Sequence, residues 1–175
     1  MASVEMSEAA LFPEHTGATF SPCSLYRYTL WRTWHASEPT CLFLMLNPST
    51  ADESANDPTV TRCQRRAWSM GYGGLVVCNI FAYRSTDPQA LYTLDDPVGP
   101  DNDAAILDQA RQAGLVVCGW GKHGALHGRG TAVLNMLRSA GIQPHALQIN
   151  GDGSPKHPLY VGYGRQPSPI EVAQS

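Results

Sequence analysis

The amino-acid sequence predicts an α/β fold: a three-layer sandwich with a central, mostly parallel four-stranded sheet and an additional N-terminal antiparallel strand. Three short apolar runs, at residues 41–46, 75–79 and 115–119, end at turn residues, as strands buried on both faces do. Helical patterns separate these runs, so we expect βαβ units with helices on both faces of the sheet. The 175 residues are 43% hydrophobic and 15% charged, which is typical of a globular domain with little disorder.

The N-terminal part of the chain is predicted to contribute the antiparallel strand. Residues 1–24 show no sustained period, and we expect a loosely ordered arm there. Residues 26–34 alternate roughly and are rich in aromatic and β-branched side chains, which favours a strand. The connection to residues 41–46 is short, so we expect these two strands to pair antiparallel. This assignment predicts a single α/β domain at residues 25–165 and a C-terminal tail at 166–175.

The predicted helices begin and end at residues that favour helix termini. Asp57 is placed to cap a helix whose first residue is Pro58, and Gly71 ends that helix. The expected helices span residues 59–70, 89–92, 101–113 and 130–140. A last, short strand is expected at residues 145–149, and a tail rich in Pro and Gly follows it.

Charge and cysteine content limit the classes of protein to consider. The formal net charge of −3 gives no general attraction for nucleic acid, although a local basic cleft would still bind a nucleotide or nucleic acid. The five cysteines contain no C-x-x-C pair, so we expect reduced core thiols, no metal site and no cofactor. No signal peptide and no apolar run of about 20 residues is visible, which predicts a cytoplasmic protein with no membrane partner. The sequence makes no prediction of oligomeric state.

Four of the predicted strands are followed by polar loops at one edge of the sheet. In open α/β sheets, ligands bind outside the carboxyl ends of the strands. The loops cover residues 47–50, 79–84, 120–123 and 150–157. We therefore expect them to converge on one ligand site.

Side chains in these loops offer an amide, a carboxylate and an imidazole for catalysis. Asn47 can orient a water or bind a base edge, although it is equally suited to a turn before proline. Asp52 is a candidate base, whereas Asp57 is more readily explained as a helix cap. Lys156 and His157 provide a cation near neutral pH that can stabilise an oxyanion, or simply belong to a polar loop. The predicted catalytic residues are Asn47, Asp52 and His157.

The predicted substrate-binding residues lie in the same loops. Trp120 offers a stacking face for a base, unless it belongs to the core. Basic residues on the first helix and in the loops suit an anion, or form a solvated positive face. The Gly-rich segments match neither a P-loop nor a dinucleotide fingerprint, and the loop histidines lack the spacing of a metal site. The set comprises Pro48, Ser49, Thr50, Asn79, Arg84, Trp120, Lys122, His123 and Lys156.

Six segments of the chain form a recognisable combination. They are LMLNPSTADE (residues 44–53), DPTVTRC (57–63), GYGGLVVCNIFAYRSTDP (71–88), GPDND (99–103), WGKHG (120–124) and KHPLY (156–160). Together they resemble the DUF1643 family, a bacterial and phage family named as a domain of unknown function. The likeness covers nearly all of residues 26–163, and the family name implies no established activity.

The strand ends also resemble, in the same order, four motifs of the uracil-DNA glycosylase superfamily. Residues 46–49 (LNPS) are similar to its first motif, whose asparagine positions the hydrolytic water in the mismatch-specific branch. Residues 76–79, 120–121 and 157–159 are similar to an apolar strand ending in asparagine, a Trp-Gly pair and a His-Pro loop that contacts the leaving base. The resemblance implies a uracil-DNA-glycosylase-like fold. Leu46, Ser49 and Leu159 stand where the motifs usually have glycine, glycine and serine.

We therefore expect a glycosylase-like enzyme that acts on modified DNA or a nucleotide by N-glycosidic bond hydrolysis or related base chemistry. Asn47 would orient water, His157 and Lys156 would stabilise developing negative charge, and Trp120 and Asn79 would hold the base. One alternative is a non-catalytic module that binds a nucleotide or nucleic acid. Another is a scaffold or phage–host interaction protein, which predicts an apolar surface patch.

Overall fold

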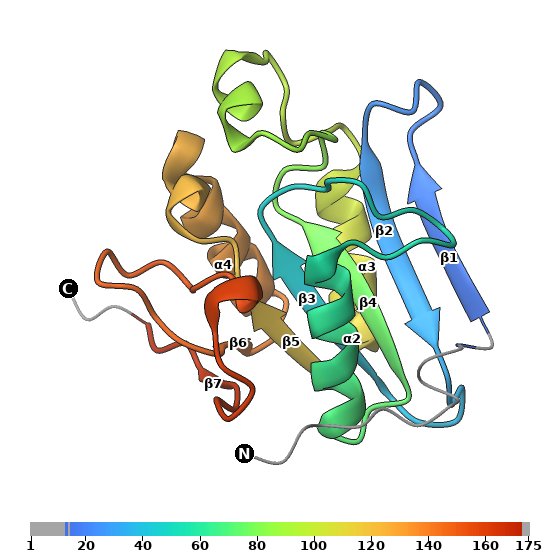
Figure 1. The fold of residues 1–175 in the computed structure, drawn as a ribbon. Helices are drawn as coiled ribbons and strands as arrows, with labels where there is room; N and C mark the ends of the chain where they lie inside the picture. The colour runs from blue at the N-terminus through green and yellow to red at the C-terminus, as the bar shows by residue number, and fades with distance from the viewer. Residues whose placement is uncertain (1–12, 14, 173–175) are drawn as a thin grey trace.

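A seven-stranded mixed sheet forms the middle layer of the structure, a computed structural model that describes residue 13 and residues 15–172 (Figure 1). Its order is β1-β2-β4-β3-β5-β6-β7. The strands are β1 His15–Phe20, β2 Arg27–Thr33, β3 Thr40–Met45, β4 Gly74–Asn79, β5 Leu115–Cys118, β6 Pro144–Ala146 and β7 Ser168–Pro169.

The parallel strands occupy the centre of the sheet and the antiparallel strands occupy its edges. β4, β3, β5 and β6 are successive parallel neighbours, whereas β1, β2 and β7 join by antiparallel pairing. The α/β class is therefore confirmed, but the sheet has seven strands rather than the predicted four. β1 lies within the range predicted as an arm, and β7 lies within the predicted tail. Residues 1–12, 14 and 173–175 of those ranges lie outside the described residues.

The predicted pairing of β2 with β3 was wrong, because β2 pairs with β4 instead. Both edges of β3 are occupied by parallel neighbours, β4 and β5. The short β2–β3 connection passes the start of β4, where the amides of Trp34 and His35 donate to Gly73 O at 3.0 and 2.9 Å. On the other side of that connection, Gly73 N donates to Pro39 O at 2.9 Å. A short connection thus spans a neighbouring strand instead of forming a hairpin.

Helices cover both faces of the sheet and bury alternate residues of its strands. On one face, α2 (Pro58–Ser69) packs through residues such as Val60 against a cluster that contains Phe43. On the other face, α3 (Asn102–Gln112) and α4 (Arg129–Ser139) pack through Ile106 and Leu137 against a cluster that contains Leu44 (Figure 1). Phe43 and Leu44 point to opposite faces because side chains alternate along a strand. The result is three layers with a core on each side of the sheet.

The helix termini follow the residues that the sequence indicated. Asp57 caps α2 by accepting from Val60 N at 2.9 Å, as predicted. Asp87 caps η1 (Pro88–Thr93), the predicted short helix, which is a 3₁₀ helix, by accepting from Gln89 N at 3.0 Å. Two further 3₁₀ segments are η2 (Lys122–Gly128) and η3 (Pro158–Tyr160). The predicted helices at residues 101–113 and 130–140 are confirmed as α3 and α4.

Cysteine burial agrees with the expectation of core thiols. Cys41, Cys78 and Cys118 are buried in β3, β4 and β5, and Cys23 is exposed. Burial raises the pKa of the Cys78 thiol to about 12. Among the described residues, none of the helices has both the length and the apolar character to cross a membrane.

Candidate functional site

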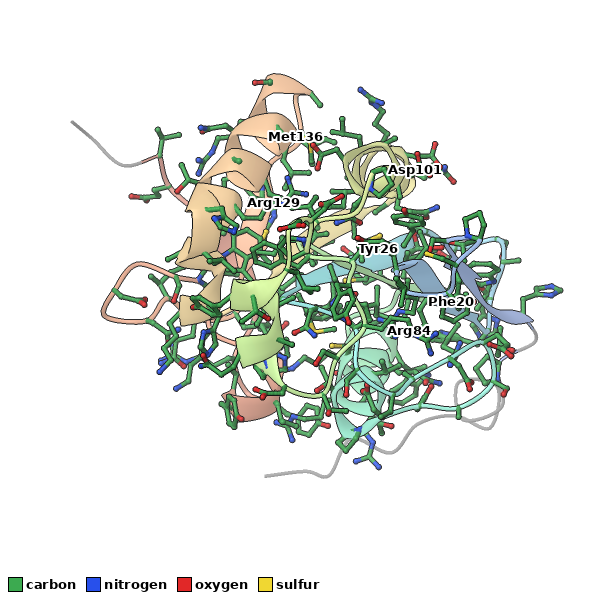
Figure 2. The ribbon with its side chains drawn as sticks, turned by 90° about the horizontal axis from the view of Figure 1, so that it is seen from above. Phe20, Tyr26, Arg84, Asp101, Arg129 and Met136 are labelled. Atoms are coloured by element: carbon green, nitrogen blue, oxygen red, sulfur yellow. The ribbon has the colours of Figure 1, made fainter. Side chains whose placement is uncertain are left out.

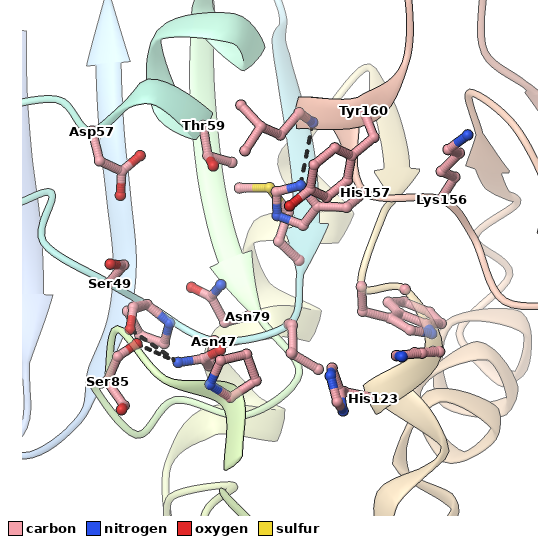
Figure 3. Close-up of a pocket in the computed structure, with 18 of the residues that line it drawn as sticks. Asn47, Ser49, Asp57, Thr59, Asn79, Ser85, His123, Lys156, His157 and Tyr160 are labelled. Atoms are coloured by element: carbon pink, nitrogen blue, oxygen red, sulfur yellow. Dashed lines mark hydrogen bonds between the residues drawn. The ribbon is translucent and has the colours of Figure 1, made fainter. Parts of the chain in front are cut away.

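A cavity of about 730 Å³ lies at the carboxyl ends of the parallel strands (Figure 3). Backbone bonds continue the strand register into its floor: Ile80 N donates to Met45 O at 2.9 Å, and Gly119 N donates to Leu44 O at 2.7 Å. The segments that follow β3, β4 and β5 therefore leave the sheet side by side, at the same end of the three strands. Segments from these strand ends and from residues 150–160 supply most of the lining, and the start of α2 supplies part of it. The cavity has a size typical of a site for a small molecule.

The structure brings most of the predicted site residues to this cavity. The lining includes Asn47, Pro48, Ser49, Asn79, Trp120, Lys122, His123, Lys156 and His157. It also includes residues that sequence reasoning did not select, namely Arg27, Asp57, Thr59, Ser85, Asn150, Asp152 and Tyr160.

Asn47 is held by its amide nitrogen, which leaves its oxygen as an acceptor. Nδ2 donates to Ser85 O at 2.8 Å and to Pro48 O at 3.2 Å. Ser85 N in turn donates to Pro48 O at 3.0 Å, so the loops after β3 and β4 are joined at this point. Asn47 therefore fixes the turn and also presents Oδ1 as a hydrogen-bond acceptor in a residue that lines the cavity.

In Asn79 it is the amide oxygen that is engaged, because a buried arginine donates to it, whereas in Asn47 it is the amide nitrogen. Arg27 is 2% exposed, and its Nη2 donates to Asn79 Oδ1 at 3.2 Å while Nη1 donates to Ala51 O at 2.9 Å. Burial lowers the pKa of Arg27 to about 10, and the negative charge of Asp57 acts in the opposite direction. Asn79 is left with Nδ2 as a donor. The signal for Arg27 was a charged residue within a predicted strand rich in aromatic and β-branched side chains, since a charge that becomes buried needs a partner.

Asp57 is both a helix cap and a part of the cavity wall. Its Oδ1 accepts from Val60 N, and Figure 3 shows the carboxylate directed toward the space between Ser49 and Thr59. The cap that sequence reasoning preferred is confirmed. Lining the cavity is an additional property, which depends on where α2 begins relative to the sheet.

His157 is a hydrogen-bond acceptor at one ring nitrogen. Its Nδ1 accepts from Leu159 N at 3.2 Å, which caps η3 and places the ring proton on Nε2. Burial lowers the pKa of His157, and the charge of Asp57 opposes that shift. The imidazole is therefore a neutral Nε2–H donor at neutral pH, and the positive charge of the predicted Lys156–His157 pair lies on Lys156.

Trp120 is packed rather than open to a stacking partner. It is 3% exposed, and a Cβ added at Gly124 or Gly130 would lie only 2.1 or 2.7 Å from its ring. The indole thus fills the space beneath η2 and the start of α4. Tyr160, which is 72% exposed and lies 5.9 Å from the His157 ring, presents an aromatic face at the rim instead.

Three predicted site residues do not line the cavity. Thr50 is exposed where the chain leaves β3. The Oδ1 of Asp52 accepts from Ser54 N at 2.9 Å and Ala55 N at 2.8 Å, bonds that lower the pKa of Asp52 and close a turn. Arg84 donates from Nη1 to a loop carbonyl and lies 4.7 Å over the Phe20 ring (Figure 2). Asp52 was predicted because it is close to Asn47 in the sequence, but the turn places its side chain outside the cavity lining.

The cavity lining has mixed charge and no arrangement suited to a metal. Cations are contributed by Arg27, Lys122 and Lys156, and carboxylates are contributed by Asp57 and Asp152. Within residues 15–172, no group of three or more His, Cys, Asp or Glu side chains is placed to hold a metal ion. The groups available to a ligand are therefore amides, carboxylates, hydroxyls, imidazoles, ammonium groups and a guanidinium group.

The comparisons with known proteins give one finding. A family model described as a protein of unknown function, DUF1643, matches residues 27–159, which include every residue that lines the cavity except Tyr160. No curated protein and no solved structure matches the chain.

Proposed function

The chain belongs to the DUF1643 family, and we propose that it is a glycosylase-like enzyme that hydrolyses the N-glycosidic bond of a nucleobase-containing substrate. The observation that carries the proposal is the pair of amides on neighbouring strand ends. Asn47 presents an acceptor that suits an attacking water, and Asn79 presents a donor that suits an acceptor on a base. Both residues line the cavity, and Met45 and Asn79 are register partners of β3 and β4.

The remaining polar groups suit the charge that develops when a base departs. Cleavage of a C–N glycosidic bond leaves negative charge on the base. The Nε2–H of His157 and the ammonium group of Lys156 are donors for that charge. Lys122 also lines the cavity and suits a phosphate of a nucleotide or of modified DNA. Because Trp120 is packed in the core, its proposed part in holding the base is limited to its cavity-facing edge.

We propose a uracil-DNA-glycosylase-like arrangement as the finer description of the fold. It is supported by the parallel strands β3, β4 and β5 and by the order of the polar loops that follow them. The position of Asn47 after β3 corresponds to the water-positioning asparagine of the mismatch-specific branch. Leu46, Ser49 and Leu159 differ from the usual motifs, so a substrate other than uracil in DNA fits this chain better.

The test is release of free base from a panel of modified oligonucleotides and nucleotides, followed by mass spectrometry. Wild type should release base from at least one member, and Asn47→Ala should lower the single-turnover rate by about 10²-fold or more, because water is no longer oriented. Asn135→Ala, an exposed residue of α4, is the matched control and should retain the wild-type rate. Equal inactivity of wild type and Asn47→Ala across the panel would overturn the proposal, and tight binding without turnover would instead establish a binding module.

A further inference from the structure

We propose that Asp57 is the general base of this site, and that its Oδ2 accepts the proton of the attacking water. The inference rests on the proposed hydrolytic function and adds a catalytic residue that neither the family nor the sequence motifs indicate. From the sequence, Asp57 was more readily explained as a helix cap than as a base. Its position in the structure gives the same carboxylate a second use.

One oxygen of the Asp57 carboxylate is held by a hydrogen bond, and the other accepts none from the described residues. Oδ1 accepts from Val60 N at 2.9 Å, and the extended backbone at the cap leads directly into Pro58. This bond sets the side-chain orientation, which Figure 3 shows to be toward the cavity. Oδ2 accepts no hydrogen bond from any residue that the structure describes. A base needs such an oriented oxygen within reach of water.

Among the described residues, no cation forms an ion pair with the Asp57 carboxylate within 4.0 Å. Within the described part of the chain, Arg129–Asp103 is the one ion pair closer than 4.0 Å, and it lies on the far side of the sheet from α2. The negative charge of Asp57 opposes the lowering of the pKa by burial at both Arg27 and His157. The Asp57 carboxylate is therefore not held in an ion pair with any residue that the structure describes.

The other carboxylate candidates are committed to turns. Asp152 lines the cavity, but its Oδ1 accepts from Ser154 Oγ at 2.6 Å and from Ser154 N at 2.9 Å in an exposed loop. Asp52 closes the turn at Ser54 and lies outside the lining. Asp57 alone among these three combines a fixed orientation with a place in the cavity wall at the start of α2.

The proposed step conserves atoms and charge. Asp57 Oδ2 takes one proton from water as the water oxygen forms a bond to the anomeric carbon of the sugar. The C–N bond breaks, and its electron pair stays on the base nitrogen, where His157 Nε2–H and Lys156 stabilise the negative charge. The proton then passes from Asp57 through solvent to the base. The products are a sugar hydroxyl and a neutral base, and the Asp57 carboxylate is regenerated.

Two substitutions separate the cap from the base. Asparagine and serine cap helices about as well as aspartate, so Asp57→Asn and Asp57→Ser should keep the melting temperature within about 2 °C of wild type. Neither side chain can accept a proton from water. Asp87→Asn is the matched control, because Asp87 caps η1 in an Asp-Pro pair of the same kind but does not line the cavity.

The experiment measures single-turnover base release from the panel member that wild type cleaves fastest. Asp57→Asn and Asp57→Ser should lower the rate by about 10²–10⁴-fold, whereas Asp87→Asn should not change it. Added sodium formate should restore part of the rate to Asp57→Ser, because a small carboxylate can occupy the space left by the shorter side chain. Purely structural damage would not respond to formate.

The outcomes distinguish this inference from the proposed function. An Asp57→Asn rate within about threefold of wild type, with Asn47→Ala inactive, would overturn the base and leave the hydrolase standing. A loss of rate without rescue of Asp57→Ser by formate would also overturn the base and make Asp57 a positioning residue. If wild type releases no base from any panel member, both proposals fall together.

Discussion

Replacing Asn102 with alanine tests how firmly the strand end that carries Asn79 is held. Asn102 is fully buried in α3, and its Nδ2 donates to Asn79 O at 2.8 Å and to Ile80 O at 3.2 Å. A buried acceptor that loses its donor costs about 1–3 kcal/mol. Ile80 O keeps a bond from Arg129 Nε at 2.7 Å, so the loss falls mainly on Asn79 O.

Two smaller contributions to the change in the free energy of unfolding caused by Asn102→Ala have opposite signs. The weaker bond to Ile80 adds about 1 kcal/mol to the loss. Asn102 Oδ1 is itself buried without a partner among the described residues, and its removal offsets about the same amount. We therefore expect Asn102→Ala to lower the free energy of unfolding by about 1–3 kcal/mol, which corresponds to about 2–4 °C in melting temperature per kcal/mol for a chain of this size.

Urea unfolding at neutral pH is the appropriate assay, with Gln112→Ala as the control. Gln112 is exposed at the end of the same helix, and its substitution should change stability by less than about 0.5 kcal/mol. Asn102→Asp should destabilise at least as much as alanine, because it keeps the shape but places a carboxyl group against two carbonyl oxygens. A change below about 0.5 kcal/mol for Asn102→Ala would refute the reasoning that these bonds hold the strand end.

Two further predictions concern groups around the cavity. Burial lowers the pKa of His157, so below the ordinary value of 6.5 the unfolded chain binds more protons than the folded chain. Acidification from about pH 7.5 to about pH 5.5 should therefore destabilise wild type more than His157→Asn. The asparagine keeps a hydrogen-bond acceptor for Leu159 N. Urea unfolding at the two pH values checks this, and equal losses in both proteins would contradict it. Gly124→Ala should destabilise by about 1–3 kcal/mol, because its Cβ would lie 2.1 Å from Trp120 Cδ1, whereas Gly164→Ala meets no atom within 4 Å and should be nearly neutral. Thermal melting distinguishes the two, and an unchanged melting temperature for Gly124→Ala would show that Trp120 is not tightly packed.

Strands buried on both faces were predictable, and edge strands were not. β3, β4 and β5 are apolar along most of their length, so they read as continuous hydrophobic runs. β1 carries mostly exposed or half-buried residues and therefore shows no such run. Its place is set by long-range contact: Gly17 pairs with Trp31, and any Cβ on Gly17 would lie 2.1 Å from that ring. Packing between residues that are distant in the sequence leaves no local sequence pattern from which the strand can be predicted.

The location of the cavity was predictable from the strand ends, but the hydrogen bonds of its lining residues were not. Asn47 and Asn79 reach the cavity because parallel strands end at one edge. Their polarity depends on which neighbour donates or accepts, and Arg27 and Ser85 are distant from them in sequence. Hydrogen bonds between distant residues cannot be inferred from spacing.

The loop after Asn47 shows why nearness in sequence did not bring Asp52 to the cavity. Arg32 is 2% exposed, and its Nη2 donates to Asp52 O at 2.6 Å and to Ala55 O at 3.2 Å. This buried arginine of β2 holds the loop beside β1 and β2, away from the cavity lining. The chain returns to the cavity at Asp57, five residues later, where α2 begins.

The most direct test of the central claim is where a nucleotide binds. A C-nucleotide has a carbon–carbon bond between base and sugar, so it cannot be hydrolysed and will remain intact in a crystal soaked to saturation. We predict a base in the cavity with an acceptor facing Asn79 Nδ2, an ordered water on Asn47 Oδ1 and an ordered water on Asp57 Oδ2. A cavity that holds only solvent in crystals soaked with each of a panel of C-nucleotides, or a nucleotide bound only elsewhere on the molecule, would contradict the account.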